Sequence, residues 1–298
     1  MARKRKGRPI HGWLVIDKPP AMTSARVVAK VLESTGAAKA GHGGTLDPMA
    51  TGVLPVALGE ATKTTAYVMG GTKVYRFTVR WGEARDTDDA EGVVTETSEA
   101  RPDEAQIRAA LPDFTGVVSQ VPPAFAAIKV GGRRAYALAR RGEAVELAPR
   151  EVTIDRFELL RVVDADHAAF EVVCGKGTYV RALARDLAAR LGTVGHLSEL
   201  RRTRVGEFRE GDAISLDNLA ALGHSAALST HLRPVETALA DIPALAMTEQ
   251  QAGRLRHGQA VQVDCEEPGL VRATADGRLV ALAEVNEGTA RPVRVFNL

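Results

Sequence analysis

Residues 41–63, GHGGTLDPMATGVLPVALGEATK, form the stretch around which the rest of the chain can be interpreted. The stretch opens with a glycine-rich turn that carries His42 and then presents Asp47, whose backbone is restricted by the proline after it. Residues 52–58 have the length and apolar content of a buried strand. A carboxylate in a loop on such a rigid element is well placed for chemistry. A turn or helix cap is the usual role of Asp before Pro, so the residues alone leave both interpretations open.

Length and composition predict a globular chain. The 298 residues suffice for one large or two ordinary domains, and 45% of them are hydrophobic. No apolar run approaches the roughly 20 residues that span a bilayer, so we expect no membrane association. The two cysteines, Cys174 and Cys265, lie far apart, which argues against a disulfide framework and for a reducing compartment. We therefore expect a cytoplasmic protein.

Charge is unevenly distributed along the chain, although the formal net charge is only +2. Residues 1–10 form a basic tail without the apolar core of a secretory signal, and we expect this tail to be disordered. Residues 83–104 carry nine acidic and two basic side chains, whereas residues 170–210 carry eight basic and five acidic ones. Such segregation fits either a polyanionic partner or ordinary solvated helix faces.

The periodicity of residues 11–240 predicts interspersed strands and helices. Ser24 is a candidate N-cap for a helix over residues 25–33, and Thr178 for a helix that ends at Arg190. Residues 73–81 alternate as a half-buried strand, and this alternation alone favours a core position for Tyr75. Further elements are expected at residues 61–69 (helix), 102–111 (helix), 134–141 (basic helix), 152–163 and 168–174 (paired strands) and 199–208 (arginine-rich strand). Without a regular βαβ alternation, the large domain is predicted to be α+β with a mixed or antiparallel sheet.

The pattern changes near residue 240. Residues 241–298 contain one short helix and several brief strand-like runs, which predicts a small β-rich C-terminal domain. Motifs for nucleotide phosphates, serine hydrolases and zinc proteases are missing from the sequence, and the seven histidines lack the spacing of metal ligands. We therefore expect neither a cofactor nor a metal.

Several long motifs, in order, resemble those of the bacterial tRNA pseudouridine synthase B family. The stretch at residues 41–63 resembles that family's catalytic motif. The others are HGWLVIDKPPAMTSARVV (residues 11–28), YRFTVRWGEARDTDDAEG (75–92), VPPAFAAIKVGGRRAYALARRG (121–142), VVCGKGTYVRALARDLAARLG (172–192) and HLSELRRTRVGEF (196–208). The resemblance implies a pseudouridine synthase catalytic domain over residues 11–240, with a basic insertion at about 121–150, and a PUA-like domain over 241–298. One departure is Ala21, which stands where the family usually has glycine.

The resemblance also implies a reaction and a set of site residues. The reaction is isomerisation of uridine to pseudouridine at position 55 in the tRNA T loop, with base flipping and an essential aspartate. Asp47 matches that aspartate, Tyr75 the tyrosine that stacks on the flipped base, and Arg181 the arginine that pairs with the aspartate. The resemblance further matches Asp89 to an acidic partner of the arginine, Tyr179 and Leu200 to the uridine pocket, His42 to the histidine that enters the T loop, and Lys18 to a structural or backbone-contacting lysine.

The expected partner is therefore the T arm of tRNA, bound by a monomeric protein. Phosphate contacts are expected from Lys129, Arg133, Arg134, Arg140, Arg141 and the strand segment 201–204. Two alternatives remain open on the sequence. One is an RNA-binding or RNA-folding module with a vestigial catalytic loop, and the other is a guide-dependent synthase of the archaeal and eukaryotic kind.

Overall fold

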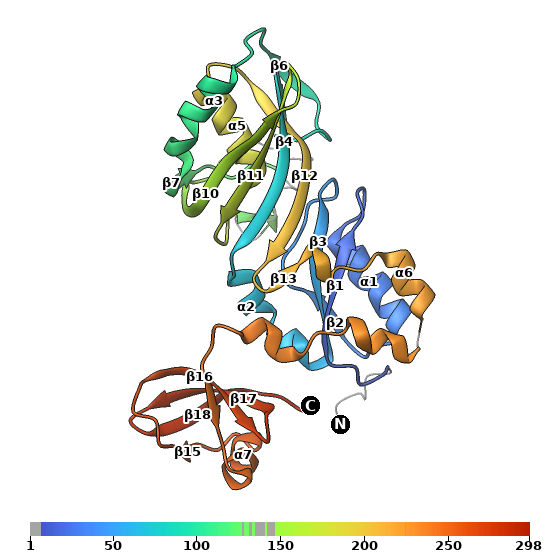
Figure 1. Ribbon diagram of the computed structural model, residues 1–298, viewed down its shortest axis with the longest axis vertical. Coiled ribbons are helices and arrows are strands. Elements are labelled where there is room, and N and C mark those ends of the chain that lie inside the picture. The colour runs from blue at the N-terminus through green and yellow to red at the C-terminus, as the bar shows by residue number, and fades with distance from the viewer. Residues whose placement is uncertain (1–6, 127, 131–132, 135–140, 142–146, 224) are drawn as a thin grey trace.

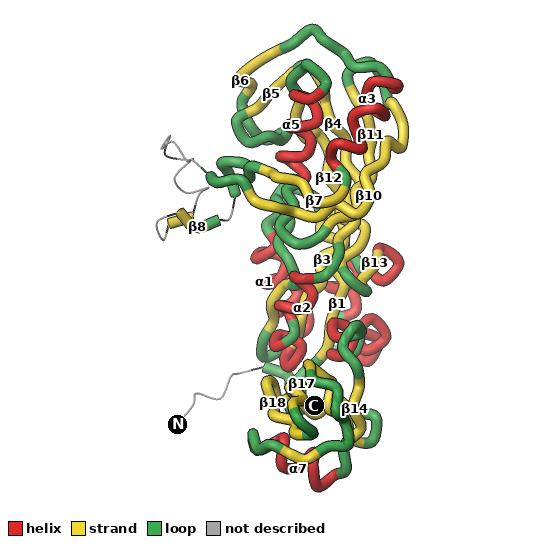
Figure 2. Tube along the Cα trace, turned by 90° about the vertical axis from the view of Figure 1, so that its left-hand side faces the viewer, coloured by secondary structure: helices red, strands yellow, loops and turns green. Residues whose placement is uncertain are grey.

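The computed structural model is elongated, and its layers follow one another along the long axis (Figure 1). It describes residues 7–126, 128–130, 133–134, 141, 147–223 and 225–298. The far lobe contains helices α3 and α5, the middle contains α1 and α6, and the C-terminal domain forms the opposite end (Figures 1 and 2). Residues 1–6 of the predicted basic tail and most of the predicted helix at 134–141 lie outside the described residues. The expected disorder is wrong for the end of that tail, because the backbone of Arg8 pairs with Ala37 in a parallel bridge.

The part of the chain before residue 240 alternates irregularly between strands and short helices. Its strands are β1 (Gly12–Lys18), β2 (Ala40–His42), β3 (Thr51–Leu58), β4 (Lys73–Trp81), β5 (Glu83–Arg85), β6 (Val94–Thr97), β7 (Gly116–Gln120), β8 (Lys129–Val130), β9 (Arg133–Arg134), β10 (Arg150–Val162), β11 (His167–Cys174), β12 (Gly195–Val205) and β13 (Phe208–Arg209). Its helices are α1 (Ser24–Thr35), η1 (Gly59–Lys63), α2 (Thr65–Gly70), α3 (Glu104–Ala110), η2 (Leu111–Phe114), α5 (Val180–Arg190), η3 (Glu210–Asp212), α6 (Leu216–Leu222), η4 (Ala226–His231) and η5 (Val235–Leu239).

One mixed sheet of nine strands runs through this part of the molecule. Its main order is β1-β3-β12-β4-β11-β10-β7, with β2 added beside β3 and β13 beside β12. All of its pairings are antiparallel except that of β3 with β12. The predicted α+β class with a mixed or antiparallel central sheet is therefore confirmed.

Strand β3 is apolar throughout because both of its faces are buried. Leu54, Val56 and Leu58 point into the main core with α1, whereas Val53 and Ala57 join a second core on the other face. A strand buried on both faces reads as a continuous apolar run rather than an alternating one. The prediction of a buried strand from residues 52–58 is confirmed for this reason.

The side of β3 that faces away from β1 is shared by two partners. Strand β12 pairs only with Thr51 and Gly52, and β2 pairs with the last three residues of β3. Pro55 falls between these pairings, so the N–H that it lacks interrupts no ladder there. At Gly52 a Cβ would lie 2.2 Å from the carbonyl oxygen of Arg202, so this narrow seam between β3 and β12 requires glycine.

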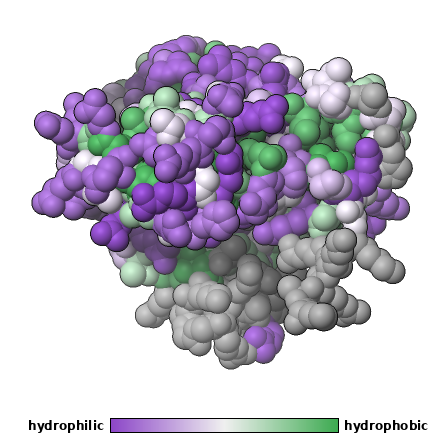
Figure 3. Space-filling model, turned by 90° about the horizontal axis from the view of Figure 1, so that it is seen from below, coloured by the Kyte–Doolittle hydropathy of each residue, from purple (hydrophilic) through white to green (hydrophobic). Residues whose placement is uncertain are grey.

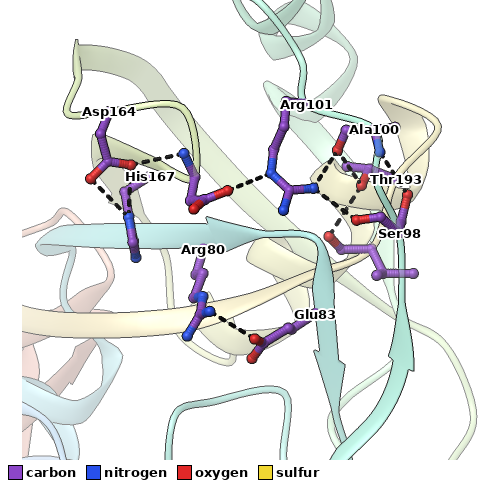
Figure 4. A network of polar contacts seen from close by, with 10 residues as sticks. Arg80, Glu83, Ser98, Ala100, Arg101, Asp164, His167 and Thr193 are labelled. Carbon is purple, nitrogen blue, oxygen red and sulfur yellow. Dashed lines mark hydrogen bonds and ion pairs between the residues drawn. The ribbon is translucent and has the colours of Figure 1, made fainter.

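The far lobe is organised by its helices and by a polar network at its tip. Helix α5 packs on β12 and α3 on β10, so both cover the same face of the sheet. At the tip, Arg101 donates to Asp166 and to the carbonyls of Ser98 and Ala100, and Thr193 also donates to Ala100 (Figure 4). These contacts fix the loop between β6 and α3 against the β10–β11 turn, away from the predicted site residues.

The C-terminal domain is a small β-rich unit, as predicted. Its elements are β14 (Ala244–Ala246), α7 (Glu249–Arg256), β15 (Val261–Gln262), β16 (Gly269–Ala275), β17 (Arg278–Asn286) and β18 (Thr289–Val295), with sheet order β14-β16-β17-β18-β15. It packs on the second core through Leu279, Leu282 and Phe296. Lys63 of η1 also donates to the Val295 carbonyl at 2.8 Å. Seen from this end, the molecule is largely hydrophilic (Figure 3).

Several predicted helix starts differ from the observed ones. Thr23, not Ser24, caps α1, and the Ser24 hydroxyl instead contacts a distant loop. Asp103, one residue after the predicted start, caps α3 with a capping box, so the helix itself begins at Glu104. The predicted helix at 61–69 is divided by Thr64 into η1 and α2. Within the described residues, no helix has the length and apolarity needed to cross a membrane.

Ala21 adopts a left-handed backbone with φ of 57°, a conformation that costs a residue with a Cβ about 1 kcal/mol. We expect Ala21→Gly to raise the free energy of unfolding by up to about 1 kcal/mol, which corresponds to roughly 2–4 °C in melting temperature. Thermal melting measures the change. Ala25→Gly, the same substitution at an exposed position inside α1, should destabilise by about 1 kcal/mol. Equal effects at the two positions would contradict the assignment of strain to Ala21.

Candidate active site

The loop that carries Asp47 joins β2 to β3 and is held by its backbone. The Ser24 hydroxyl accepts from the Leu46 amide at 2.9 Å and donates to the Leu46 carbonyl at 3.1 Å. Lys18 Nζ, which is fully buried, donates to the Pro48 carbonyl at 2.9 Å. These two contacts fix the residues on either side of Asp47, while the Asp47 side chain itself remains 36% exposed. The carboxylate is thus presented from a fixed backbone.

Arg181 meets this carboxylate from the first turn of α5. Its Nε lies 2.9 Å from Asp47 Oδ2 without hydrogen-bond alignment, so the contact is an ion pair. The rest of the guanidinium donates to the carbonyls of Thr87 and Phe125 at 2.9 and 3.0 Å. Asp89 lies behind it at 3.5 Å and is buried. The sequence-predicted grouping of Asp47, Arg181 and Asp89 is therefore present in space.

A side-chain amide orients the start of α5. Gln120, which is buried, accepts from the Tyr179 amide at 2.8 Å and donates to the Tyr179 carbonyl at 3.1 Å. Tyr179 is the N-cap residue, whereas the predicted cap, Thr178, donates to the Gly175 carbonyl and ends the preceding turn. Because Tyr179 has no side-chain cap bond, its ring stays available beside Arg181.

A cleft of about 320 Å³ opens between this helix start, the Asp47 loop and the inner face of β4 and β12. Five of the predicted site residues line it: Asp47, Tyr75, Tyr179, Arg181 and Leu200. The other lining residues are Gly44, Thr45, Leu46, Met69, Lys73, Gly175, Gly177, Thr178, Val180 and Arg202. Such a volume is within the range of pockets that hold small organic groups.

Tyr75 departs from the pattern of its strand. Phe77, Val79 and Trp81, on the same face of β4, are buried, whereas Tyr75 is half-buried at the cleft. Desolvation of its hydroxyl raises the pKa of Tyr75 and outweighs the opposite effect of Arg202. The phenol is therefore neutral across the physiological range, which suits a ring that stacks on another.

The remaining predicted residues lie around the cleft rather than on its wall. Lys18 is beneath the loop, and Asp89 is behind Arg181. His42 ends β2 and is half-buried, and its Nδ1 has no hydrogen-bond partner among the described residues. Burial and the nearby Arg202 lower the pKa of His42, which keeps the imidazole neutral near pH 7.

Arg202 was expected on the RNA-contacting surface, and this expectation is wrong. Only 1% of Arg202 is exposed, and its guanidinium is directed into the protein. The sequence does contain a signal for this burial: Arg202 lies two residues after Leu200, and residues two apart on a strand face the same side. Lys73, which also lines the cleft, was missed as a site residue. Its Nζ donates to the carbonyls of Met69 and Gly71, and burial lowers its pKa to about 8.

The basic insertion cannot be compared with its prediction in full, because much of it lies outside the described residues. Among the residues that the structure describes, no group of three or more histidine, cysteine or acidic side chains is arranged to hold a metal ion.

The comparisons with known proteins cover the whole chain. Residues 32–180 match the family model "TruB family pseudouridylate synthase (N terminal domain)", residues 181–240 match "tRNA pseudouridylate synthase B C-terminal domain", and residues 242–297 match "tRNA Pseudouridine synthase II, C terminal". The tRNA pseudouridine synthase B of Bradyrhizobium diazoefficiens is 57% identical over 99% of this chain and 88% of its own length. That of Rhodospirillum rubrum is 53% identical over the full length of both.

The chain belongs to the tRNA pseudouridine synthase B (TruB) family. Its activity is the isomerisation of uridine to pseudouridine in tRNA. Among solved structures, an H/ACA RNP bound to a substrate RNA containing 2'-deoxyuridine has a TM-score of 0.75 and 25% identity, covering 100% of this chain and 92% of that one. A Cbf5-Nop10-Gar1 complex has the same score and identity, with 90% of that chain covered.

Lys18 provides a pH test of how the loop is supported. Burial lowers the pKa of Lys18 to about 8, with the Asp47 charge acting in the opposite direction. Between pH 8 and 10.5 the unfolded lysine retains a proton that the folded one has lost, so rising pH favours the folded state. From pH 7.5 to 9.5 we expect wild type to gain about 2 kcal/mol of stability relative to Lys18→Met.

Chemical denaturation at the two pH values measures this difference. Lys30→Met serves as the matched control, because Lys30 is exposed on α1. Its stability relative to wild type should be the same at both pH values. A Lys18→Met variant that behaves in the same way would show that Lys18 titrates as an ordinary solvated lysine.

Proposed function

We propose that the chain modifies the uridine at position 55 of the T loop, that the base is extruded into the cleft, and that Asp47 is the essential group. The observation that carries this proposal is the Asp47–Arg181 ion pair at 2.9 Å, set in a cleft that is also lined by Tyr75, Tyr179 and Leu200. One exposed carboxylate beside aromatic and apolar walls suits a planar uncharged base with its ribose.

The reaction conserves atoms. The N1–C1′ bond of the uridine breaks, a C5–C1′ bond forms, a proton leaves C5 and N1 gains one. Asp47 is the nucleophile in this proposal, and attack at the base or at the ribose is compatible with its position. Arg181 holds the carboxylate in a fixed orientation, and its other donors are occupied by backbone carbonyls, so it cannot follow the substrate. Asp89 keeps the guanidinium in place from behind.

Extrusion of a stacked uridine costs a few kcal/mol, which contacts in the cleft must offset. We propose that the Tyr75 ring stacks on the extruded base and that Tyr179 and Leu200 complete the pocket. His42 would fill space that the extruded base vacates in the T loop. In this proposal Lys18 acts indirectly, by supporting the Asp47 loop, since both of its hydrogen bonds go to backbone carbonyls.

The proposed partner is the T arm, which the protein binds as a monomer in the cytoplasm. Phosphate contacts from the basic insertion would supply affinity without reading sequence. Relatives more than 50% identical over the full chain are tRNA pseudouridine synthases B, which favours action without a guide RNA. The complete set of Asp47, Tyr75 and Arg181 favours catalysis over a vestigial RNA-binding loop.

Asp47→Asn tests the essential carboxylate. Tritium release from 5-labelled uridine in a tRNA transcript should fall at least ~1,000-fold, because the amide is a poor nucleophile, while binding of the transcript persists. Asp113→Asn is the matched control: Asp113 is exposed and pairs with Arg190 on the surface, so its activity should equal that of wild type. Turnover by Asp47→Asn at the wild-type rate would refute the assignment.

The position of the modified uridine and the need for a guide can be tested together. A T-arm hairpin alone, with no other RNA, should be modified at position 55. The same hairpin with cytidine at position 55 should yield no pseudouridine, as mapped by primer extension after carbodiimide treatment. Activity that appears only when a second RNA is added would instead support a guide-dependent enzyme.

A further inference from the structure

Arg202 is a buried cation that the proposed chemistry does not use. It extends from β12 toward the start of β3, and 1% of it is exposed. Among the described residues, no carboxylate lies within ion-pair distance of its guanidinium. A buried charge without a counter-ion costs several kcal/mol unless its donors are satisfied, and a hydrophobic residue of similar size is usually more stable. A stabilising effect alone therefore does not account for an arginine at this position, and the groups that satisfy its donors indicate its role.

Backbone carbonyls at both ends of the Asp47 loop satisfy this guanidinium. Nε donates to the Val53 carbonyl at 2.9 Å, just after the loop enters β3. The two terminal nitrogens donate to Gly44 and Thr45 at 3.1 and 3.3 Å, just before the loop reaches Asp47. One rigid, planar group thus joins the two ends of the loop.

Arg202 is also the cross-strand neighbour of Tyr75. The two residues are register partners where β12 pairs with β4, and both line the cleft. The positive charge of Arg202 also opposes the rise in the pKa of Tyr75 that burial causes. The guanidinium that holds the loop presenting Asp47 therefore belongs to the residue paired across the strands with the ring proposed to stack on the uridine.

We propose that Arg202 is a positioning residue for the isomerisation: its guanidinium fixes the Asp47 loop and Tyr75 in one frame, so that the nucleophile and the stacking ring meet the same extruded base. This inference rests on the proposed roles of Asp47 and Tyr75. Arg202 contributes to the chemical step rather than to the affinity for tRNA, because its donors are directed to the backbone and not to the surface. Lysine keeps the charge but cannot satisfy three divergent carbonyls, so the planar fork is the required feature.

The test compares Arg202→Lys with Arg101→Lys. Arg101 likewise donates to two backbone carbonyls (Figure 4), but it does not line the cleft. For Arg202→Lys we expect kcat on a T-arm hairpin to fall at least ~30-fold, while KM and the Kd of the hairpin stay within about threefold of wild type. For Arg101→Lys we expect a lower melting temperature with kcat within twofold.

A structural role alone would lower kcat only in proportion to the unfolded fraction, which thermal melting and active-site titration with a 5-fluorouridine hairpin measure. A fall in kcat that only matches the unfolded fraction would overturn the proposal. An unchanged kcat, with or without a raised KM, would overturn it as well. The wild-type rate and Asp47→Asn are measured in the same assay, so failure of the proposed chemistry appears in those two samples and is distinguishable from failure at Arg202.

A second measurement does not depend on a folded Arg202 variant. In Tyr75→Phe, which retains Arg202, the ¹⁵Nε resonance of Arg202 should shift relative to wild type, because its cross-strand neighbour in the cleft has lost the hydroxyl. Tyr67→Phe, which alters a tyrosine outside the cleft, should leave that resonance in place. An unchanged Arg202 resonance in Tyr75→Phe would overturn the coupling of the loop to the tyrosine.

Discussion

The ion pair between Asp47 and Arg181 joins two segments that the fold must deliver independently. Asp47 comes from a loop between the first strands of the chain, and Arg181 comes from a helix that follows the far lobe of the sheet. The ion pair at 2.9 Å orients the carboxylate only if both partners are held in place. An exposed ion pair between mobile side chains contributes little to stability. Most of the surrounding polar contacts restrain one partner or the other: those around Asp47 act on the backbone of its loop, and those around Arg181 act on both the backbone and the guanidinium.

The restraints differ in kind on the two sides. On the loop side they are single buried side chains. A lysine and an arginine donate to carbonyls of the loop, and a serine hydroxyl accepts from the Leu46 amide and donates to the Leu46 carbonyl. On the helix side, Gln120 fixes the first peptide of α5, and the guanidinium of Arg181 is itself bound by Thr87 and Phe125. Hydrogen bonds to a charged group are worth more than neutral ones when water is excluded, so few are needed. The carboxylate remains the accessible part of the assembly.

Sequence periodicity predicted the elements whose burial is simple. The run at β3 predicted a strand because both of its faces are covered, and Gly36 ended α1 in the left-handed conformation that glycine favours. Helix starts were less predictable. Ser24 is a good capping residue, but its hydroxyl binds the Asp47 loop, and the neighbouring Thr23 caps the helix instead. Capping propensities describe only local partners, so they cannot predict that a distant loop binds the Ser24 hydroxyl.

The site shows a similar division. The grouping of Asp47, Tyr75, Tyr179, Arg181 and Leu200 around one cleft could be predicted only through resemblance, since alternation alone assigns Tyr75 to the core. The burial of Lys18 and Arg202 could have been predicted from the alternation of side chains along their strands. Lys18 shares a face of β1 with Leu14 and Ile16, and Arg202 shares a face of β12 with Leu200. The charge of Arg202 led to the opposite prediction, because charged side chains are mostly exposed unless they are paired. Its partners here are backbone carbonyls, which cannot be identified from amino-acid composition.

The seam at Gly52 has a mechanical consequence. Strands β3 and β12 pair through only two residues, and among the described strands this is the only pairing that joins β1, β2 and β3 to the rest of the large sheet. Asp47 lies just before this narrow seam on one side of it, and Arg181 is carried on the other side. A relative rotation of the two parts about the seam would displace the ion pair less than a contact farther out along either part.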